Sequence, residues 1–331
     1  MASIASTADA TNRRARSDRG ITTPEPKFQA LLEWVRQNSS KKLNAAWNKV
    51  QLGRELLSDG DGVMVAMSAI PKGTKLTLPP ACIITQDKVV ESVVGKLFGG
   101  LDIYSLFSLF LLNQKQQGQS SFWEPYINVL PSDISFHPIT FLAHYGNRTE
   151  EQNKLLGAEL ENYPLLKRAL VAQKAKLEGE WKRVKQLIKL HKRQSGLDSA
   201  SLSASNAIGQ MNYNDFLWAN CMVISRAFNI AEPRMMCMLP LVDSMNHNSL
   251  EPNVKWKPKF VRGHFIMHIT SDIDASVELT AAYHEHPAKS NDARAESMAN
   301  LKCYLMYGFV EYGLHDGTPF VSVRRAVTSQ P

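Results

Sequence analysis

The sequence has few cysteines and no pairing pattern among them. Four cysteines stand far apart in 331 residues, and none forms the Cys-x-x-Cys spacing of a zinc-binding motif. A chain of this length can bury a sizeable core without disulfides. We therefore predict no zinc cluster and no disulfide framework around these residues, which are Cys82, Cys221, Cys237 and Cys303.

The sequence also lacks an apolar run long enough to cross a membrane. The longest, 101–112, includes Asp102 and two serines, so it predicts a buried helix. Residues 1–23 have no apolar stretch of the kind found in secretory signals and no apolar periodicity, which predicts a disordered leader. We expect a cytoplasmic or nuclear protein. A short organellar transit peptide is the alternative, because four arginines outnumber the acids there: Arg13, Arg14, Arg16 and Arg19.

Positive charge is concentrated in one segment. The whole chain carries 38 Lys and Arg against 31 Asp and Glu, a net charge of +7. Residues 167–193 alone hold ten Lys or Arg and two Glu, a local balance of +8, so the remainder is close to neutral. Because the basic character belongs to one segment, the overall charge does not indicate a nucleic-acid-binding protein.

That basic segment has the apolar periodicity of a helix. Residues 150–193 carry apolar side chains at helical spacing with Lys and Arg between them. We expect Lys182, Arg183 and Lys185 to face solvent or a partner, and residues 195–206 to form a linker. The apolar stripe consists of Leu166, Leu170, Leu177, Trp181, Val184 and Ile188.

Short strands and helices are predicted on either side of this segment. Pro24-Glu25-Pro26 opens a helix, because Phe28, Leu31, Leu32 and Val35 share one face. The aromatic cluster around Trp123 should pack in the core. Strands are predicted at 63–67, around Leu76 and Leu78, at 264–269 and at 277–283. The mixture indicates an α+β fold.

The stretch 214–253 joins an apolar helix to a polar loop. Phe216, Leu217, Ala219, Met222 and Val223 recur at helical steps. The following loop places several hydrogen-bonding side chains beside hydrophobic residues, which suits a polar ligand at the edge of the core. A loop that caps its own backbone is the alternative. The polar residues are Asp243, Asn246, His247, Asn248 and Ser249.

Several motifs occur in a family-specific order. Ser-Arg-Ala-Phe at 225–228, followed by Asp-x-x-Asn-His-x-Ser from Asp243, resembles the SET-domain protein lysine methyltransferases, in particular the Rubisco large-subunit methyltransferase-like subgroup. Gly60-Asp61-Gly62 matches an earlier motif. Glu-Leu-Thr-x-x-Tyr from Glu278 and Tyr-Gly-Phe-Val from Tyr307 match later ones. The resemblance extends from about Phe28 to Tyr312.

The resemblance implies a SET-domain β-fold with a pseudoknotted C-terminal segment and a helical insertion. On this basis residues 1–27 are a leader, 28–149 the first half of the SET domain, 150–205 the insertion, 206–312 the catalytic half and 313–331 a tail. Members of the subgroup usually continue into a helical C-terminal lobe, which we expect to be absent from this chain.

The resemblance also implies a function: S-adenosylmethionine-dependent methylation of a lysine in a non-histone protein, such as an enzyme or a ribosomal protein. Tyr283 would be the catalytic tyrosine. Substrate lysine would contact Ser225, Phe228 and Asp243. We predict no metal site at His284, Glu285 and His286, because adjacent residues on a strand or turn point apart and no third ligand is evident. The cofactor would be held by Asp59, Gly60, Asp61, Gly62, Arg226, Asn246, His247, Tyr307 and Phe309.

Some features depart from the subgroup and leave alternatives open. Asp61 replaces the usual Arg or aliphatic residue, and the stretch between Tyr283 and Tyr307 is longer, so either Asn291 or Asn300 could fill the family's Asn position. One alternative is a catalytically weak SET scaffold that binds cofactor or a partner protein. Another is a histidine-directed methyltransferase. We expect a monomer whose protein substrate has an acidic surface.

Overall fold

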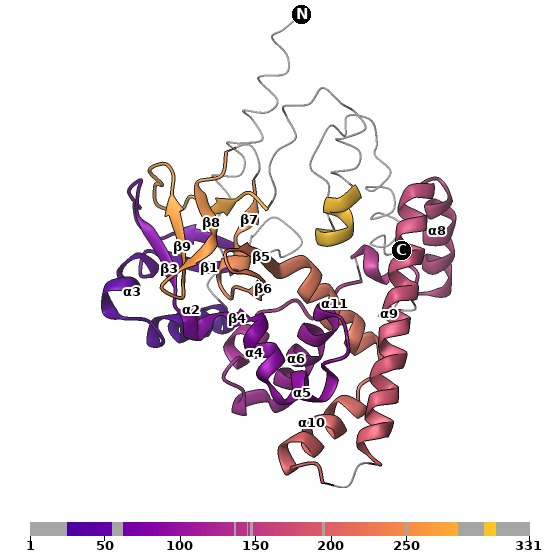
Figure 1. Ribbon diagram of the computed structural model, residues 1–331. Helices are drawn as coiled ribbons and strands as arrows, with labels where there is room; N and C mark the ends of the chain where they lie inside the picture. Colours follow the sequence, from indigo (N-terminus) through magenta and orange to yellow (C-terminus); the bar gives the residue numbers. More distant parts are fainter. Residues whose placement is uncertain are drawn as a thin grey trace, which may run out of the picture. The chain divides into compact units, whose positions relative to one another are not determined.

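The computed structural model describes residues 25–54, 62–135, 137–143, 145, 148–193, 196–248, 251–283 and 301–308. The chain divides into two compact units. One comprises residues 1–85 and 228–286 and contains the β-sheets; the other comprises residues 86–227 and 287–331 and is mainly helical (Figure 1). The prediction of a mixed fold is confirmed. The units cut across the segments inferred from the family resemblance, whose boundaries remain a prediction.

The β-rich unit begins with two helices. Helix α2 (Pro26–Gln37) starts at the last residue of Pro24-Glu25-Pro26 and buries the predicted face, including Leu31 and Val35. Helix α3 (Lys41–Trp47) follows. Trp47 at its end is fully buried, and its indole Nε1 donates to the Thr77 carbonyl at 2.8 Å. This contact attaches α3 to strand β3 (Lys75–Leu78).

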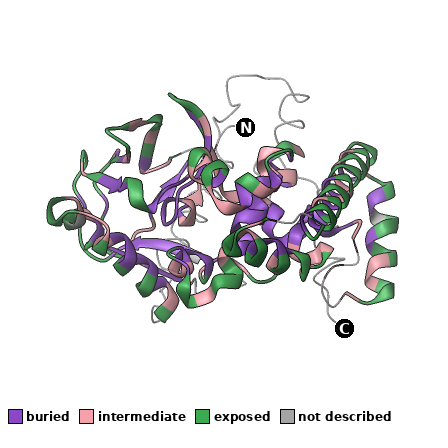
Figure 2. Cartoon of the chain, turned by 60° about the horizontal axis from the view of Figure 1, so that its bottom comes forward, coloured by how far each residue is buried: buried purple, intermediate pink, exposed green. Residues whose placement is uncertain are grey.

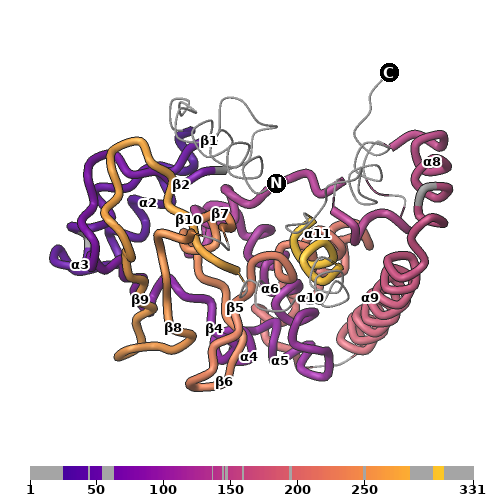
Figure 3. The backbone as a smooth tube through the Cα atoms, turned by 90° about the horizontal axis from the view of Figure 1, so that it is seen from above, coloured from indigo at the N-terminus to yellow at the C-terminus, as the bar shows by residue number. Residues whose placement is uncertain are grey.

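The main sheet of this unit has five strands in the order β3-β9-β8-β10-β7. Strand β10 lies between β8 and β7 and runs parallel to both, while β9 is antiparallel to β3 and β8. Figure 3 shows β7 and β10 side by side. The strands are β3 (Lys75–Leu78), β7 (Asn246–His247), β8 (Val254–Val261), β9 (His264–Ile269) and β10 (Thr280–Ala281).

Two smaller sheets complete the unit. Strands β1 (Val50–Arg54) and β2 (Gly62–Ala66) form an antiparallel pair. Strands β4 (Ile84–Thr85), β6 (Arg234–Met238) and β5 (Ala227–Ala231) form the other, in that order. The strands expected at 63–67, 76–78 and 264–269 are confirmed. The one expected at 277–283 is much shorter, because residues 276–279 hydrogen-bond to β2 as an irregular segment before β10 begins.

The helical unit is built around α6 (Ile103–Gln117) and α11 (Tyr213–Arg226), which pack against each other. Both confirm predicted buried helices. Asp102 caps α6, and Asn212 with Asp215 forms a capping box at α11. Near α6, Trp123 and Tyr126 are buried as predicted, whereas Phe122 is exposed. The remaining short helices are α4 (Gln86–Glu91), α5 (Val93–Phe98) and α7 (Glu124–Ile127).

Helix α9 (Pro164–His191) is the longest in the described chain and buries the predicted apolar stripe. In Figure 2, where residues are coloured by burial, helices show buried purple stretches that alternate with exposed green ones. Helix α8 (Glu150–Glu161) packs beside α9. The predicted linker is wrong: residues Ser199–Gly209 form helix α10. Asp198 caps it, and Ala204, Ser205 and Ile208 are buried.

A half-buried arginine and a buried histidine hold the segment that precedes α8. The Arg148 guanidinium donates to the carbonyls of Ser135 at 3.0 Å and Ala143 at 2.7 Å, and to both oxygens of Thr140. His137 is 2% exposed, and its Nε2 lies 3.1 Å from the Met306 carbonyl. It therefore ties this segment to residues 301–307, which are helical.

Among the described residues, no helix has the length and apolar character needed to span a membrane.

Candidate active site

Tyr283 lies just after β10 and makes two hydrogen bonds with β7 and the residue before it. Its hydroxyl donates to the Met245 carbonyl at 2.6 Å, and its backbone N–H donates to His247 Nδ1 at 2.9 Å. The two rings are tilted, with centroids 4.9 Å apart. Because His247 Nδ1 accepts, the proton of the neutral ring lies on Nε2. Tyr283 and His247 are thus held in one orientation relative to each other.

Asn246 is fixed by the neighbouring strand and by a carboxylate. It pairs with Thr280 across β7 and β10, and its Nδ2 donates to Glu278 Oε1 at 2.8 Å. Asn253 supports this arrangement, since its side chain donates to the Glu278 carbonyl at 2.7 Å and accepts from Thr280 N–H at 2.8 Å. The sequence interpretation assigned no role to Glu278 or Asn253. Glu278 opens a recognised motif, but nothing in the pattern singled out Asn253.

A tight turn precedes β7, the strand that carries Asn246 and His247. Leu241 is fully buried and has a φ of 75°, a left-handed conformation that non-glycine residues adopt only a few per cent of the time. The short 3₁₀ helix Val242–Ser244 follows. The Asp243 N–H donates to the Leu239 carbonyl at 3.1 Å. The turn positions the Met245 carbonyl opposite the Tyr283 hydroxyl.

The strand that begins at the last glycine of the Gly60-Asp61-Gly62 motif lies beside the segments that carry Asn246 and Glu278. Strand β2, which starts at Gly62, packs against β7 and the 242–244 turn. The Leu279 N–H donates to the Met64 carbonyl at 2.7 Å, and Val65 forms a bridge with Glu278. Gly62 therefore begins a strand that runs next to the segment carrying Glu278. Asp59, Gly60 and Asp61 lie outside the described residues.

Phe228 lies in the same unit, in an aromatic cluster. Its ring centroid is 5.6 Å from that of Trp256 and 6.2 Å from that of Phe265. The partners lie on β8 and β9, so the cluster joins β5 to the main sheet. The sequence interpretation expected Phe228 as a wall of the lysine channel and did not identify Trp256.

The other expected site residues belong to the helical unit. Ser225 Oγ donates to the Cys221 carbonyl at 2.7 Å in the last turn of α11, and Arg226 ends that helix. Burial raises the pKa of the Cys221 thiol, while the Arg226 charge acts in the opposite direction. Burial raises the pKa of Tyr307 to about 12, so it is neutral near pH 7. Phe309, Asn291 and Asn300 lie outside the described residues.

The structure thus brings Asn246, His247 and Tyr283 together within one unit, with Asp243 three residues before Asn246. The group offers amide, imidazole and phenol side chains at a strand end, all of them partly exposed. Such a set can bind a polar ligand and orient an amine through hydrogen bonds. Among the described residues, no cluster of three His, Cys, Asp or Glu could hold a metal ion.

Comparisons with known proteins concern the family and the fold. The SET-domain family model matches residues 62–284. The chain is 30% identical over 173 residues to the chloroplastic [fructose-bisphosphate aldolase]-lysine N-methyltransferase of Arabidopsis thaliana, covering 52% of this chain and 31% of that protein. It is 28% identical over 227 residues to the chloroplastic ribulose-1,5 bisphosphate carboxylase/oxygenase large subunit N-methyltransferase of Nicotiana tabacum, covering 68% and 40% respectively.

A solved structure, the SET domain of LSMT bound to lysine and AdoHcy, has the same fold. It superposes with a TM-score of 0.62 at 20% sequence identity, covering 86% of this chain and 57% of that one. This chain therefore spans less than two thirds of the length of each of these three proteins.

Proposed function

Because the chain belongs to the SET-domain family, we propose that it is an S-adenosylmethionine-dependent protein-lysine N-methyltransferase. The observation that carries the proposal is the fixed group of Asn246, His247 and Tyr283. The Arabidopsis relative is named as a lysine N-methyltransferase of an enzyme, and the tobacco relative as an N-methyltransferase of an enzyme's large subunit. We propose the same substrate class here: a lysine of an enzyme-type protein.

The residues around β7 fit the cofactor's amino-acid part, which carries an ammonium and a carboxylate. An asparagine amide has two N–H donors and one carbonyl acceptor. The hydrogen bond from Asn246 Nδ2 to Glu278 orients the amide and uses one of these groups. Asn246 and His247 would hold the cofactor, together with Gly62 and, as the family resemblance implies, Asp59, Gly60 and Asp61. When bound, S-adenosylmethionine supplies an electrophilic methyl group on a positively charged sulfur.

Tyr283 would orient the substrate amine. Its hydroxyl proton is directed to the Met245 carbonyl, so the lone pairs of the phenol oxygen are turned toward other donors. That oxygen can accept an N–H of a lysine amine and thereby aim the nitrogen lone pair at its target. Direct displacement needs alignment more than a strong base. The roles expected for Ser225, Arg226, Phe228, Asp243, Tyr307 and Phe309 rest on the family resemblance alone.

Substitution of Tyr283 tests the proposal. Tyr283→Phe keeps the ring but removes the hydroxyl, so turnover should fall roughly 10²-fold or more, while cofactor affinity measured by calorimetry stays within about twofold. Tyr213→Phe, on α11, is the matched control and should keep the wild-type rate. A Tyr283→Phe enzyme with wild-type turnover would show that the tyrosine only packs.

Labelled S-adenosylmethionine with a cell lysate, followed by mass spectrometry, separates the proposal from its alternatives. Label on a lysine supports a lysine methyltransferase. Label on a histidine would indicate a histidine-directed enzyme. Cofactor binding by calorimetry without any labelled protein, in a panel of lysates, would indicate a binding scaffold.

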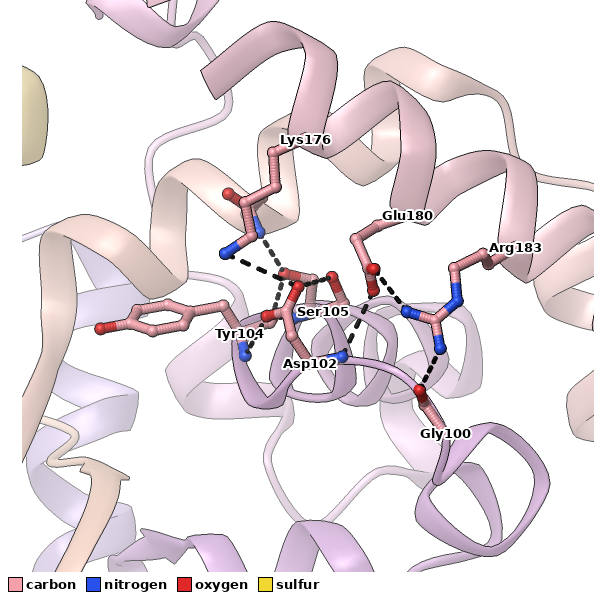
Figure 4. Close-up of polar contacts among 9 residues, drawn as sticks. Gly100, Asp102, Tyr104, Ser105, Lys176, Glu180 and Arg183 are labelled. Atoms are coloured by element: carbon pink, nitrogen blue, oxygen red, sulfur yellow. Dashed lines mark hydrogen bonds and ion pairs between the residues drawn. The ribbon is translucent and has the colours of Figure 1, made fainter. Parts of the chain in front are cut away.

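We further propose that the substrate presents an acidic surface, because the charges of α9 divide into two sets. One set fastens the helix to the start of α6 (Figure 4). Lys176 Nζ lies 3.8 Å from Asp102 Oδ2. Arg183 donates to Glu180 Oε1 at 2.7 Å and also to the Gly100 carbonyl, and Asp102 N–H donates to the other Glu180 oxygen. Arg183 is therefore exposed, as expected, and also bound to its own helix and to the segment that precedes α6.

The second set faces outward. Lys182, Lys185 and Lys189 are exposed and recur at steps of three and four residues, which places them on one side of the helix. Lys185 also lies over the Trp181 ring, 5.5 Å from its centroid. Within the described residues, none of these three lysines has an acidic side chain at ion-pair distance. Their charge is therefore available to attract a partner.

Charge reversal on this side tests the idea. Lys182→Glu with Lys189→Glu should raise KM for the protein substrate roughly tenfold at low salt, because exposed charges act mainly on association, and leave kcat on a short peptide unchanged. The same charge change on α3, Lys41→Glu with Lys42→Glu, is the control. Equal KM values for both double variants would show that α9 is only a solvated helix.

We retain two further proposals from the sequence: a cytoplasmic or nuclear location, and a monomeric state. Light scattering of the purified chain tests the second, and a dimer mass would contradict it. Fluorescence microscopy of the tagged chain tests the first, with targeting to an organelle as the contrary result.

A further inference from the structure

Three adjacent strands of the main sheet carry only basic charge. Strands β3, β9 and β8 together contain four lysines and two histidines and no aspartate or glutamate. Strand β3 is separated from β8 and β9 by more than half of the sequence, so charge counting along the chain does not reveal the patch. It exists only because the sheet brings these strands together.

The register aligns three of the basic side chains in a row. Lys75 on β3 and Lys255 on β8 both pair with His268 on β9. All three are exposed, whereas their strand neighbours Leu76 and Met267 are buried. Side chains alternate between the two faces of a strand, so the row lies on the outer face of the sheet. Lys257 and Lys259 are exposed further along β8 and extend the patch.

The lysines of this patch have no ion-pair partner within the described part of the molecule, although Glu232 forms a β-bridge with Lys259. No ion pair there involves Lys75, Lys255, Lys257 or Lys259. Lys75 and Lys255 stand on either side of His268 on the same face. An anion bound on this face could therefore contact both lysines.

The remaining chemistry of the face favours a protein partner over nucleic acid or membrane. The aromatic residues of β8 and β9 are Trp256, Phe260 and Phe265; Trp256 and Phe265 form the cluster with Phe228, and Phe260 contacts Phe265. They are therefore not available as a platform on which bases stack. On the three strands, Val261 is the single large hydrophobic residue that is exposed, which gives little apolar area for insertion into lipid.

We propose that this face binds an acidic protein segment in extended conformation. Alternate residues of a regular strand are spaced about 7 Å apart. Lys255 and Lys257 are alternate residues of β8, whose register with β9 shifts between Trp256 and Phe260, and an extended chain with Asp or Glu at every second position has a similar spacing. Such a segment could lie along β8, with Lys75 and His268 beside it. The proposal does not depend on methyl transfer, and an inactive protein would bind the segment equally well.

The direct test is fluorescence anisotropy at low salt with a labelled synthetic peptide of alternating Glu and Thr. Lys255→Glu with Lys257→Glu should weaken binding roughly tenfold or more, since each lost pair contributes up to about fivefold and reversal adds repulsion. Lys96→Glu with Lys154→Glu, exposed lysines of the helical unit with the same total charge change, should alter affinity less than about twofold. Equal losses in both variants would overturn the proposal.

Two further probes test the shape and class of the partner. A peptide of the same composition with all Glu in one block should bind more weakly than the alternating one; equal affinity would contradict an extended, spaced fit. Oligouridine RNA and phosphatidylserine vesicles are tested in parallel. Tighter binding of either one, lost in the same β8 variant, would replace the acidic protein as the partner.

A neutral substitution distinguishes binding from a structural role. Lys255→Gln removes one charge of the row, so thermal stability should stay the same or rise while affinity for the alternating peptide falls a few-fold. Unchanged affinity in Lys255→Gln and in the double variant would overturn the proposal and leave the lysines as solvated surface residues.

Discussion

The buried histidine of the helical unit should make folding stability depend on pH. Burial lowers the pKa of His137 from 6.5 to about 4, although its contact with the Met306 carbonyl acts in the opposite direction. The Ile139 N–H donates to Nδ1 at 3.2 Å, so the neutral ring carries its proton on Nε2, which faces Met306. Protonation would place a charge in the core and turn Nδ1 from an acceptor into a donor.

The direction and size follow from proton linkage. Between the unfolded pKa of 6.5 and the folded pKa of about 4, the unfolded chain binds the proton more readily. Stability is therefore fully present above pH 6.5 and falls as the pH drops toward 4. Each pKa unit corresponds to about 1.4 kcal/mol, so the full loss is about 3 kcal/mol, and about 2 kcal/mol is lost between pH 8 and pH 5.

Urea unfolding of wild type and His137→Gln at pH 8 and pH 5 measures this effect. Glutamine can still donate to the Met306 carbonyl but cannot be protonated, so the stability advantage of the wild type should shrink by about 2 kcal/mol on acidification. Thr140→Val, a buried neighbour that does not titrate, should show the same difference from wild type at both pH values. An advantage for histidine that does not change with pH would refute the reasoning.

Three further substitutions have expected outcomes. His247→Ala should weaken S-adenosylmethionine binding by about 1–2 kcal/mol, as expected for one or two lost hydrogen bonds; unchanged affinity by calorimetry would remove it from the cofactor site. Arg148→Met should cost about 3 kcal/mol in urea unfolding, because several buried carbonyls lose their donor; a loss below about 1 kcal/mol would contradict this. Asp102→Ala should cost about 1–2 kcal/mol through the lost α6 cap, and a variant as stable as wild type would show that the cap is dispensable.

Helices with a strong apolar stripe were predicted correctly. The stripe of α9 and the apolar steps of α11 fall on the buried faces that the structure shows. Helix α10 was missed because serine and alanine form no stripe of large apolar residues. Its burial comes from packing against α5, α6 and α9, which lies beyond any local pattern.

The candidate site was only partly accessible from the sequence. The family resemblance identified Asn246, His247 and Tyr283 by their order in the chain. It did not identify Glu278 and Asn253 as the residues that brace them, because those contacts form when β10 inserts between β7 and β8. The resemblance likewise did not show that the Met245 carbonyl receives the Tyr283 hydroxyl.

From the sequence it was possible to predict the buried faces of α2, α9 and α11, four of the ten strands in the described chain and the family that the motifs resemble, because periodicity and motif order are properties of neighbouring residues. Which charges take part in packing and which remain exposed became visible only in the folded chain. Arg183 hydrogen-bonds to the Glu180 carboxylate and the Gly100 carbonyl. Lys75 and Lys255 come from distant parts of the chain and both pair with His268 in the sheet. Coulomb interactions depend on distance in space, and folding sets that distance independently of separation along the sequence.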